Sequence, residues 1–222
     1  MRFNISVSDE ISSRCPGFRG MAVSANVRNS DHCDLLWEEI GRLTRELRER
    51  FTRDSIKDLP PIKATRLAYR ACGKDPSRYR PSNEQLRRRI LSGNPLYQVS
   101  TLVDLVNVVS IRHGFSIGGF DAEMIQGDEL VLGIGREGEP YEGIGRGKLN
   151  IAGMPVYRDA AGGIGTPTSD HERTRMRPET TEFLALINGY SGEAGLRECA
   201  EDMARLLRLF ADGRNIEINS YK

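Results

Sequence analysis

The sequence lacks the features that mark several large classes of protein. Its four cysteines and three histidines are scattered over 222 residues, without the close spacing typical of zinc sites or disulfide frameworks. No stretch approaches the ~20 apolar residues of a membrane span. The 32 Lys and Arg nearly balance the 31 Asp and Glu, so no overall field recruits nucleic acid or an anionic membrane. The first residues alternate like a strand, not like a signal peptide. We expect a cytoplasmic protein with no metal, no organic cofactor and no membrane partner.

Hydrophobic periodicity predicts an irregular mixture of helices and strands. Helices are expected at Asp34–Phe51, Ile62–Cys72, Asn83–Leu91, Leu102–Arg112 and Glu193–Phe210. Strands are expected at Phe3–Val7, Met21–Val27, Phe183–Ile187 and in the closing IEINSY. Ten glycines between Gly133 and Gly165 indicate a hairpin-rich β layer. Since no βαβ period appears, we predict one α+β domain over residues 1–222, with β layers, flanking helices and a central buried helix.

The central helix carries an unusual polar stripe. In LVDLVNVVSIRHGFSIGGFD, Asp104, Asn107 and Ser110 recur every third residue on an otherwise apolar helix, and a glycine pair follows. Buried polar groups without partners cost about 1–3 kcal/mol each. They either tie neighbouring loops to the core or line a pocket whose ligand supplies the partners. We predict that Asp104 and Asn107 face a pocket shared with the loop Ser169–Thr174.

The basic segment Lys63–Arg89 is a second candidate functional region. It holds nine basic and two acidic residues, a net charge of +7, with tyrosines within or beside it. Converging cations next to aromatic rings are typical of RNA contacts. Three consecutive arginines, however, fan around a helix, and solvated basic helices are common. Both interpretations stay open on spacing alone. Ser82 with Gln85 also predicts a capping box at the start of the second helix in this segment.

Two other motifs are weaker than they look. Gly133-x-Gly135-x-x-Gly138 follows a predicted strand, but turns follow it where a dinucleotide site needs a helix. The string SDHERT places Ser, Asp and His next to one another, whereas the members of a catalytic triad converge from separate segments. We interpret SDHERT as a polar loop with Asp170 as a cap, and with Arg173 and Thr174 facing a pocket.

Five ordered blocks, YRACGKDPSRYRPSNEQLRRRIL, LVDLVNVVSIRHGFSIGGFD, GDELVLGIGREGE, PVYRD and GTPTSDHERTRMRPETTEFLALI, resemble a known family. Over residues 60–188 they are similar to the B3/B4 domain, the editing domain of the bacterial phenylalanyl-tRNA synthetase β subunit, in a free-standing form. That domain hydrolyses tyrosine wrongly esterified to phenylalanine tRNA. Asn107 matches its pocket asparagine and Asp121 its F-D aspartate. Gly118 stands where it has a histidine, and Leu186 and Ile187 stand where its glutamate is expected.

The resemblance implies a tRNA-associated protein, with aminoacylated tRNA as its partner, that acts as an editing deacylase. The alternatives are a non-catalytic module that binds tRNA or an amino acid, and a small-molecule enzyme on a borrowed fold. Aminoacylation itself is not expected. The expected catalytic residues are Asn107, Asp170 and Arg173. The expected substrate-binding residues are Asp104, Gly118, Gly119, Asp121, Glu139, Ser169 and Thr174. The expected RNA-binding residues are Arg70, Arg78, Tyr79, Arg80, Arg87 and Arg88. His113, at the predicted helix end, is expected to play no part in catalysis.

Overall fold

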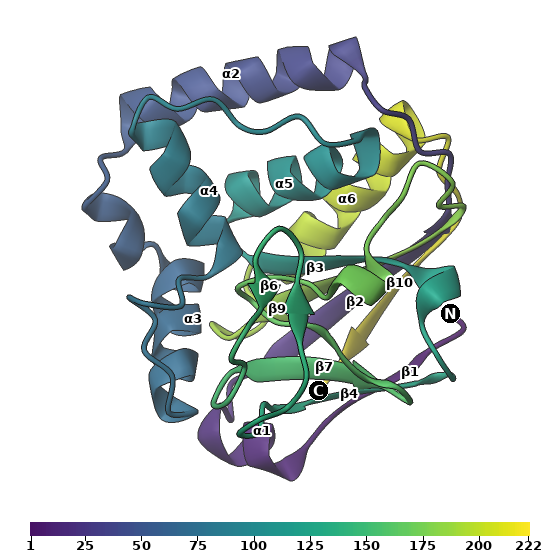
Figure 1. The fold of residues 1–222 in the computed structure, drawn as a ribbon. Coiled ribbons are helices and arrows are strands. Elements are labelled where there is room, and N and C mark those ends of the chain that lie inside the picture. Colours follow the sequence, from purple (N-terminus) through teal and green to yellow (C-terminus); the bar gives the residue numbers. More distant parts are fainter.

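Two four-stranded sheets form the framework of the protein, whose computed structural model describes all residues 1–222 (Figure 1). The first sheet is antiparallel, with the order β10 (Arg214–Tyr221), β2 (Arg19–Asn26), β9 (Glu182–Gly189) and β3 (Ser116–Asp121). The second has the order β1 (Asn4–Val7), β4 (Glu129–Ile134), β7 (Pro155–Asp159) and β8 (Gly162–Gly165), with only β1 and β4 parallel. A small hairpin joins β5 (Glu142–Gly143) to β6 (Gly147–Lys148).

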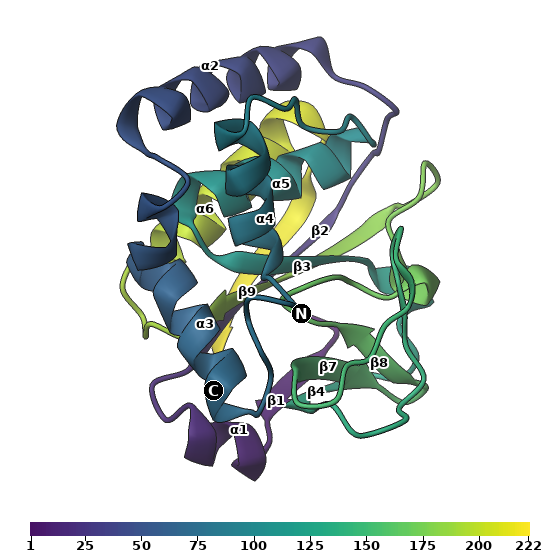
Figure 2. The same ribbon diagram turned by 60° about the vertical axis from the view of Figure 1, so that its left-hand side comes forward.

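Helices cover one face of the first sheet, and the second sheet lies against its other face (Figures 1 and 2). The longer helices are α2 (Asp34–Arg50), α3 (Pro60–Ala71), α4 (Ser82–Leu91), α5 (Thr101–His113) and α6 (Leu196–Phe210). The short ones are α1 (Asp9–Arg14) and the 3-10 turns η1 (Ser55–Asp58), η2 (Ala122–Met124) and η3 (Glu172–Thr174). The α+β prediction is therefore confirmed.

Strands β2, β9 and β3 of the first sheet are buried on both faces, which explains the nearly continuous apolar runs of β2 and β9, whereas the edge strand β10 is largely exposed. In β9, Phe183, Ala185 and Ile187 belong to the core beneath the helices. Leu184 and Leu186 point the other way, into the core between the two sheets. The period of two along a strand thus divides one apolar run between two hydrophobic cores.

Helix α5 is the predicted central helix, and nine of its thirteen residues are buried. It packs against α2, α4, α6 and β3. Gly114 ends it in the left-handed conformation, at φ +79°, which only glycine adopts without strain. The chain turns there directly into β3, so the glycine pair Gly118-Gly119 lies within a strand and beside the helix that precedes it.

The predicted capping box at Ser82 is wrong. Pro81 is the N-terminal cap of α4, and Ser82 is already helical. Asn83 instead uses its side chain to accept the Glu84 N–H and to donate to the carbonyl of Gly114. Gln85 donates to the carbonyl of Arg80. The start of α4 is therefore fastened to the end of α5. None of the helices combines the length and the apolar content needed to cross a membrane.

Candidate functional site

A cavity of about 500 Å³ opens between α5, β3, the start of α4, the β5–β6 hairpin and the loop after β8. One part of its wall is aliphatic, built from Leu86, Val99, Val103, Val106, Ile117, Ile144 and Met176. The polar part of its wall holds Ser82, Gln85, Asn107, Thr166, Thr168, Ser169 and Asp170. Arg146, Arg175 and Arg177 complete the lining together with Gly119 and Pro178. A concave apolar site with a few convergent polar groups is typical of ligand binding.

Asn107 lies in this cavity, as the sequence predicted. It is half-buried on α5, and its side-chain amide makes no hydrogen bond with any other protein group. The predicted loop partners Ser169 and Asp170 line the same cavity. Asn107 is therefore the one member of the α5 polar stripe whose hydrogen-bonding capacity is left for a ligand.

Asp170 is held firmly by its surroundings. Its Oδ2 accepts a hydrogen bond from the Gly119 N–H at 3.0 Å, and its backbone carbonyl accepts one from Ile144 at 3.0 Å. Burial raises the pKa of Asp170 to about 7, although the Gly119 hydrogen bond opposes that shift. A carboxyl group that titrates near neutral pH inside a cavity is a candidate general acid or base.

The glycines around Asp170 make room for its carboxylate. A Cβ atom added to Gly118 would lie 3.2 Å from Asp170 Oδ1, and one added to Gly165 would lie 3.0 Å from it. Both added atoms would also clash with the Phe120 ring, at 2.6 Å. A Cβ atom on Gly119 would meet Met176 and Val106 at 2.9 and 3.1 Å. Gly118 does not itself line the cavity, whereas Gly119 does. The carboxylate thus occupies space that a side chain at position 118 would need.

Asp104 was predicted to face the pocket, and the structure corrects this. Its carboxylate accepts hydrogen bonds from the Trp37 indole Nε1 at 2.8 Å and from the Val99 N–H at 3.2 Å. Burial raises its pKa, and these two bonds oppose the shift. Ser110 is likewise satisfied internally, because it donates to the carbonyl of Phe115 at 2.7 Å. These two residues of the stripe tie neighbouring segments to the core and contribute nothing to the cavity wall.

Arg173 and Glu139 also lie outside this cavity. The Arg173 guanidinium forms two hydrogen bonds to the Asp159 carboxylate, at 2.9 and 2.8 Å, and faces a separate open depression. Glu139 is held in the same way by Arg158, at 2.7 Å for both bonds. Arg173 and Glu139 each form a bidentate ion pair with an oppositely charged side chain. Such charge-assisted pairs are strong enough to fix the orientation of both side chains.

Asp121 and Thr174 are structural as well. Asp121 is fully buried and accepts hydrogen bonds from Thr180 Oγ1 at 2.9 Å and Arg177 Nη2 at 3.2 Å. Thr174 is equally buried and contacts the carbonyl of His171. Neither lines the cavity. His113 ends α5 and lies 3.1 Å from Asp202 of α6, and it is not part of the cavity lining.

The basic segment is mostly an internal scaffold. Glu84 is fully buried and pairs with Arg66 at 2.8 Å, Arg88 at 2.9 Å and Arg80 at 3.5 Å. Three arginines of the basic segment are therefore held by one buried carboxylate. The predicted RNA contacts Arg80 and Arg88 therefore have an internal partner.

Arg87 contradicts its predicted role most clearly. It is 5% exposed and donates to the carbonyls of Ile111 and Arg112 at the end of α5. Burial, with a contribution from Arg50, lowers its pKa to about 10. Arg70 and Arg78 are exposed, and the Tyr79 ring is covered by the ammonium of Lys74 at 3.8 Å. Of the six predicted RNA-binding residues, Arg70 and Arg78 remain accessible cations without an acidic partner.

Sequence reasoning missed the arginines that do reach the cavity. Arg146 lies at the tip of the β5–β6 hairpin and donates to Gln85 Oε1 of α4. Arg175 and Arg177 flank Met176 in the extended segment after η3. No regular spacing signals them, because Arg175, Met176 and Arg177 all line the cavity, whereas Arg173 in the same RTRMR string pairs with Asp159. These three arginines share one cavity with Asn107 and Asp170. Arg175 also pairs with Glu172 at 3.0 Å and Arg177 with Asp121 at 3.2 Å, whereas Arg146 has no acidic partner.

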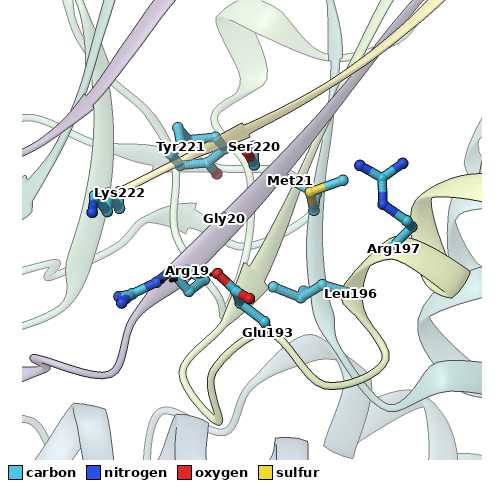
Figure 3. Close-up of a pocket in the computed structure, with 9 residues that line it drawn as sticks. All are labelled: Arg19, Gly20, Met21, Glu193, Leu196, Arg197, Ser220, Tyr221 and Lys222. Carbon is cyan, nitrogen blue, oxygen red and sulfur yellow. Dashed lines mark ion pairs between the residues drawn. The ribbon is translucent and has the colours of Figure 1, made fainter.

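A second cavity of similar volume, about 500 Å³, lies beside the end of β10 (Figure 3). It contains Arg19, Glu193, Arg197 and Lys222. Arg19 and Glu193 pair at 3.6 Å, and the side chains of Arg197 and Lys222 lie at opposite ends of the view. No buried polar group converges on a ligand position there, so the cavity containing Asn107 and Asp170 is the candidate functional site.

The comparisons with known proteins agree with this fold. The family model of the B3/4 domain matches residues 64–200. Curated protein sequences give no match. A crystal structure of an N-terminal fragment of the phenylalanyl-tRNA synthetase β subunit from Pyrococcus horikoshii is similar in fold, with a TM-score of 0.51 and 11% sequence identity. The likeness covers 100% of this chain and 53% of that one, so the chain spans about half of that fragment. Because the family model covers more than half of the sequence, the chain belongs to the B3/4 domain family.

Proposed function

We propose that this B3/4 domain protein is associated with tRNA in the cytoplasm and that its cavity hydrolyses the ester bond of a mischarged aminoacyl-tRNA. The observation that carries the proposal is the pairing of Asn107, whose amide is free, with Asp170, whose pKa lies near 7, in one cavity. The family match and the fold shared with a phenylalanyl-tRNA synthetase β-subunit fragment support the link to tRNA.

Asp170 is suited to move a proton during ester hydrolysis. At neutral pH a carboxyl group with a pKa near 7 is present in both protonation states. Its Oδ2 is occupied by the Gly119 N–H, whereas Oδ1 accepts no hydrogen bond from the protein. In the proposed reaction the ionised carboxylate takes a proton from water as that water attacks the ester carbonyl. The protonated carboxyl then returns a proton to the departing ribose oxygen.

Asn107 supplies the matching electrostatic contribution. The Gly119 N–H already donates to Asp170 and cannot also stabilise an oxyanion. The free Asn107 amide has two donors, and a donor aimed at the charge that develops on the ester oxygen lowers the barrier. Removing one such hydrogen-bond donor from a comparable site typically lowers kcat by about 10²–10³-fold.

The position of Asp170 also bears on the missing family histidine. In the synthetase editing domain that the sequence resembles, a histidine stands where this chain has Gly118. The Asp170 carboxylate lies against Gly118, 3.2 Å from the site of an added Cβ. A titratable group from the loop after β8 therefore lies beside the β3 position that carries the histidine in that domain. This exchange supports a hydrolytic role despite the departure from the family pattern.

The arginines of the cavity suit a ligand that carries phosphates. Arg146 and Arg175 are exposed, and Arg177 is partly exposed. The aliphatic wall lies beside them in the same cavity. Such a site can hold an apolar aminoacyl group against the valines while the phosphates of an RNA 3′ end contact the arginines.

A panel of mischarged aminoacyl-tRNAs tests this function. We expect the wild-type protein to release the amino acid from at least one of them, and Asn107→Ala to lose about 10²-fold in rate. His113→Ala is the matched control from the same helix and should retain its activity. Binding of the tRNAs without hydrolysis of any ester would instead indicate the non-catalytic binding module. Loss of hydrolysis in a folded His113→Ala variant would place the site elsewhere.

A further inference from the structure

The ends of α1 and α3 lie side by side, far from each other in the sequence (Figures 1 and 2). Arg14 is the last residue of α1, and its Nη1 donates to the carbonyl of Ala71, the last residue of α3, at 3.3 Å. The next residue after each helix is a cysteine. Cys15 packs against the core cluster that contains Cys72, and the two thiols lie close enough for each to shift the pKa of the other. The helix ends thus place two free thiols beside each other.

The two thiols differ in access. Cys72 is 4% exposed and belongs to the core between the sheets. Cys15 is half-buried and lines a cavity of about 380 Å³ with Ala64, Ala68 and Tyr190. The Tyr190 hydroxyl is buried without a hydrogen-bond partner in the protein. A small solute can therefore reach Cys15 through this cavity, whose lining does not include Cys72.

They also differ in acidity. The neighbouring Cys72 thiol lowers the pKa of Cys15, burial opposes that shift, and the charge of Arg14 adds to it. The neighbouring Cys15 thiol and burial raise the pKa of Cys72. The thiolate is the nucleophilic form of cysteine. Cys15 is consequently the sulfur that reacts first, and Cys72 stays protonated beside it.

We propose that Cys15 and Cys72 form a peroxide-sensitive dithiol, which closes to a disulfide between α1 and α3. The Cys15 thiolate attacks one oxygen of hydrogen peroxide, the O–O bond breaks, and Cys15 sulfenic acid and hydroxide result. The Cys72 sulfur then attacks the Cys15 sulfur and displaces its hydroxyl group, which leaves as water with the Cys72 proton. The dithiol is oxidised by two electrons, and one peroxide is reduced to two waters.

The disulfide would act on a helix that supports the candidate functional site. Tyr69, one turn before Cys72 on α3, contacts Thr168 Oγ1 through its hydroxyl at 2.8 Å. Thr168 lines the cavity that contains Asn107 and Asp170. Intracellular disulfides are mostly transient and redox-sensing. The proposal itself does not depend on the reaction carried out in that cavity.

Mass spectrometry of the full chain tests the proposal. The reduced protein is treated with hydrogen peroxide, denatured, alkylated and digested. We expect a Cys15–Cys72 linked peptide, with Cys33 and Cys199 still alkylated. Cys72→Ala should instead accumulate sulfenic acid at Cys15, which dimedone captures. Cys33→Ser is the matched control and should form the disulfide as the wild type does.

The peptide map of the peroxide-treated wild-type protein tests the proposal by itself, even if a variant folds poorly. A linked Cys15–Cys72 peptide within the monomer confirms the dithiol. No disulfide under peroxide, or a disulfide that requires Cys33, would overturn it. Dimedone labelling of Cys72 in preference to Cys15 would overturn the assigned order of reaction.

Discussion

Asp170 combines its proposed catalytic role with a cost in stability. Its folded-state pKa, about 7, lies above the ordinary value of 3.8 for an aspartate, so the folded protein retains a proton in the range where the unfolded chain has lost it. The folded state binds more protons between about pH 4 and pH 7, and the free energy of unfolding falls as pH rises through that window. Above it, the buried carboxylate destabilises the fold.

Asp170→Asn should therefore stabilise the protein at pH 8 by about 2 kcal/mol, because the amide carries no charge to desolvate and its oxygen can still accept the Gly119 N–H. Near pH 4 the variant and the wild type should differ little. Urea unfolding at the two pH values measures this difference. Equal stability of the two proteins at pH 8 would show that Asp170 is not a destabilising carboxylate.

Asn107 and Asp104 lie three residues apart on one helix but should respond oppositely to truncation. Asn107→Ala removes no protein hydrogen bond and should change the free energy of unfolding by less than about 1 kcal/mol. Asp104→Ala leaves the partly buried Trp37 indole and the Val99 amide without their acceptor and should cost about 1–3 kcal/mol. Denaturant melts of the two variants make the comparison. A larger loss in Asn107→Ala would contradict the assignment of its amide to a ligand.

Helix α4 shows where element-level prediction worked and where it failed. Its position followed from the apolar spacing and from Gly93, and the structure begins and ends it within one residue of the prediction. Its arginines were mistaken for an RNA-binding face. Sequence spacing shows which residues share a side of a helix, but only the packing of α4 against α5 shows that Arg87 lies on the buried side.

Arg87→Ala should destabilise the protein by about 2–4 kcal/mol, because it exposes the α5 carbonyls of Ile111 and Arg112 to an empty space and deletes a buried side chain. Arg70→Ala, an exposed arginine on α3, is the control and should change stability by less than about 0.5 kcal/mol. Thermal unfolding of both variants decides. Equal and small losses of stability in both variants would contradict the buried position of Arg87 and support the surface role that the sequence suggested.

The polar stripe of α5 also shows that spacing alone does not reveal the hydrogen-bond partner of a buried side chain. The period of three correctly placed Asp104, Asn107 and Ser110 near one another, and a buried polar group always needs a partner. Which partner it finds depends on segments distant in the sequence. Trp37 of α2 satisfies Asp104, the Phe115 carbonyl satisfies Ser110, and no protein group satisfies Asn107. Arg173 and Glu139 were misplaced for the same reason, since Asp159 and Arg158 could not be anticipated as neighbours.

At the scale of the whole molecule, the net charge of +1 means that the proposed tRNA binding depends on local surfaces. The proposed surface is the set of cavity arginines, Arg146, Arg175 and Arg177. The double change Arg146→Glu with Arg175→Glu should weaken tRNA binding more than Arg70→Glu with Arg78→Glu. Binding by the wild type should weaken steeply with added salt, and the cavity variant should show a shallower salt dependence. Filter binding across a salt series measures both.

Variants of Arg80 or Arg88 are unsuitable for that comparison, since both pair with the buried Glu84 and their reversal would disturb the fold. A stronger effect of the Arg70 and Arg78 pair would move the tRNA surface to α3 and the loop that follows it. Binding that ignores salt and both double variants would contradict a phosphate-binding role for either surface.

The most direct measurement is the rate of aminoacyl-tRNA hydrolysis from about pH 5 to about pH 9, for the wild type and for Asp170→Asn. If Asp170 is the general base, kcat/KM of the wild type should rise with pH and level off above an apparent pKa near 7. Asp170→Asn, although more stable, should lose most of the rate and the pH dependence with it. A variant that hydrolyses the ester as fast as the wild type, with the same pH profile, would contradict the assignment of this cavity as the hydrolytic site.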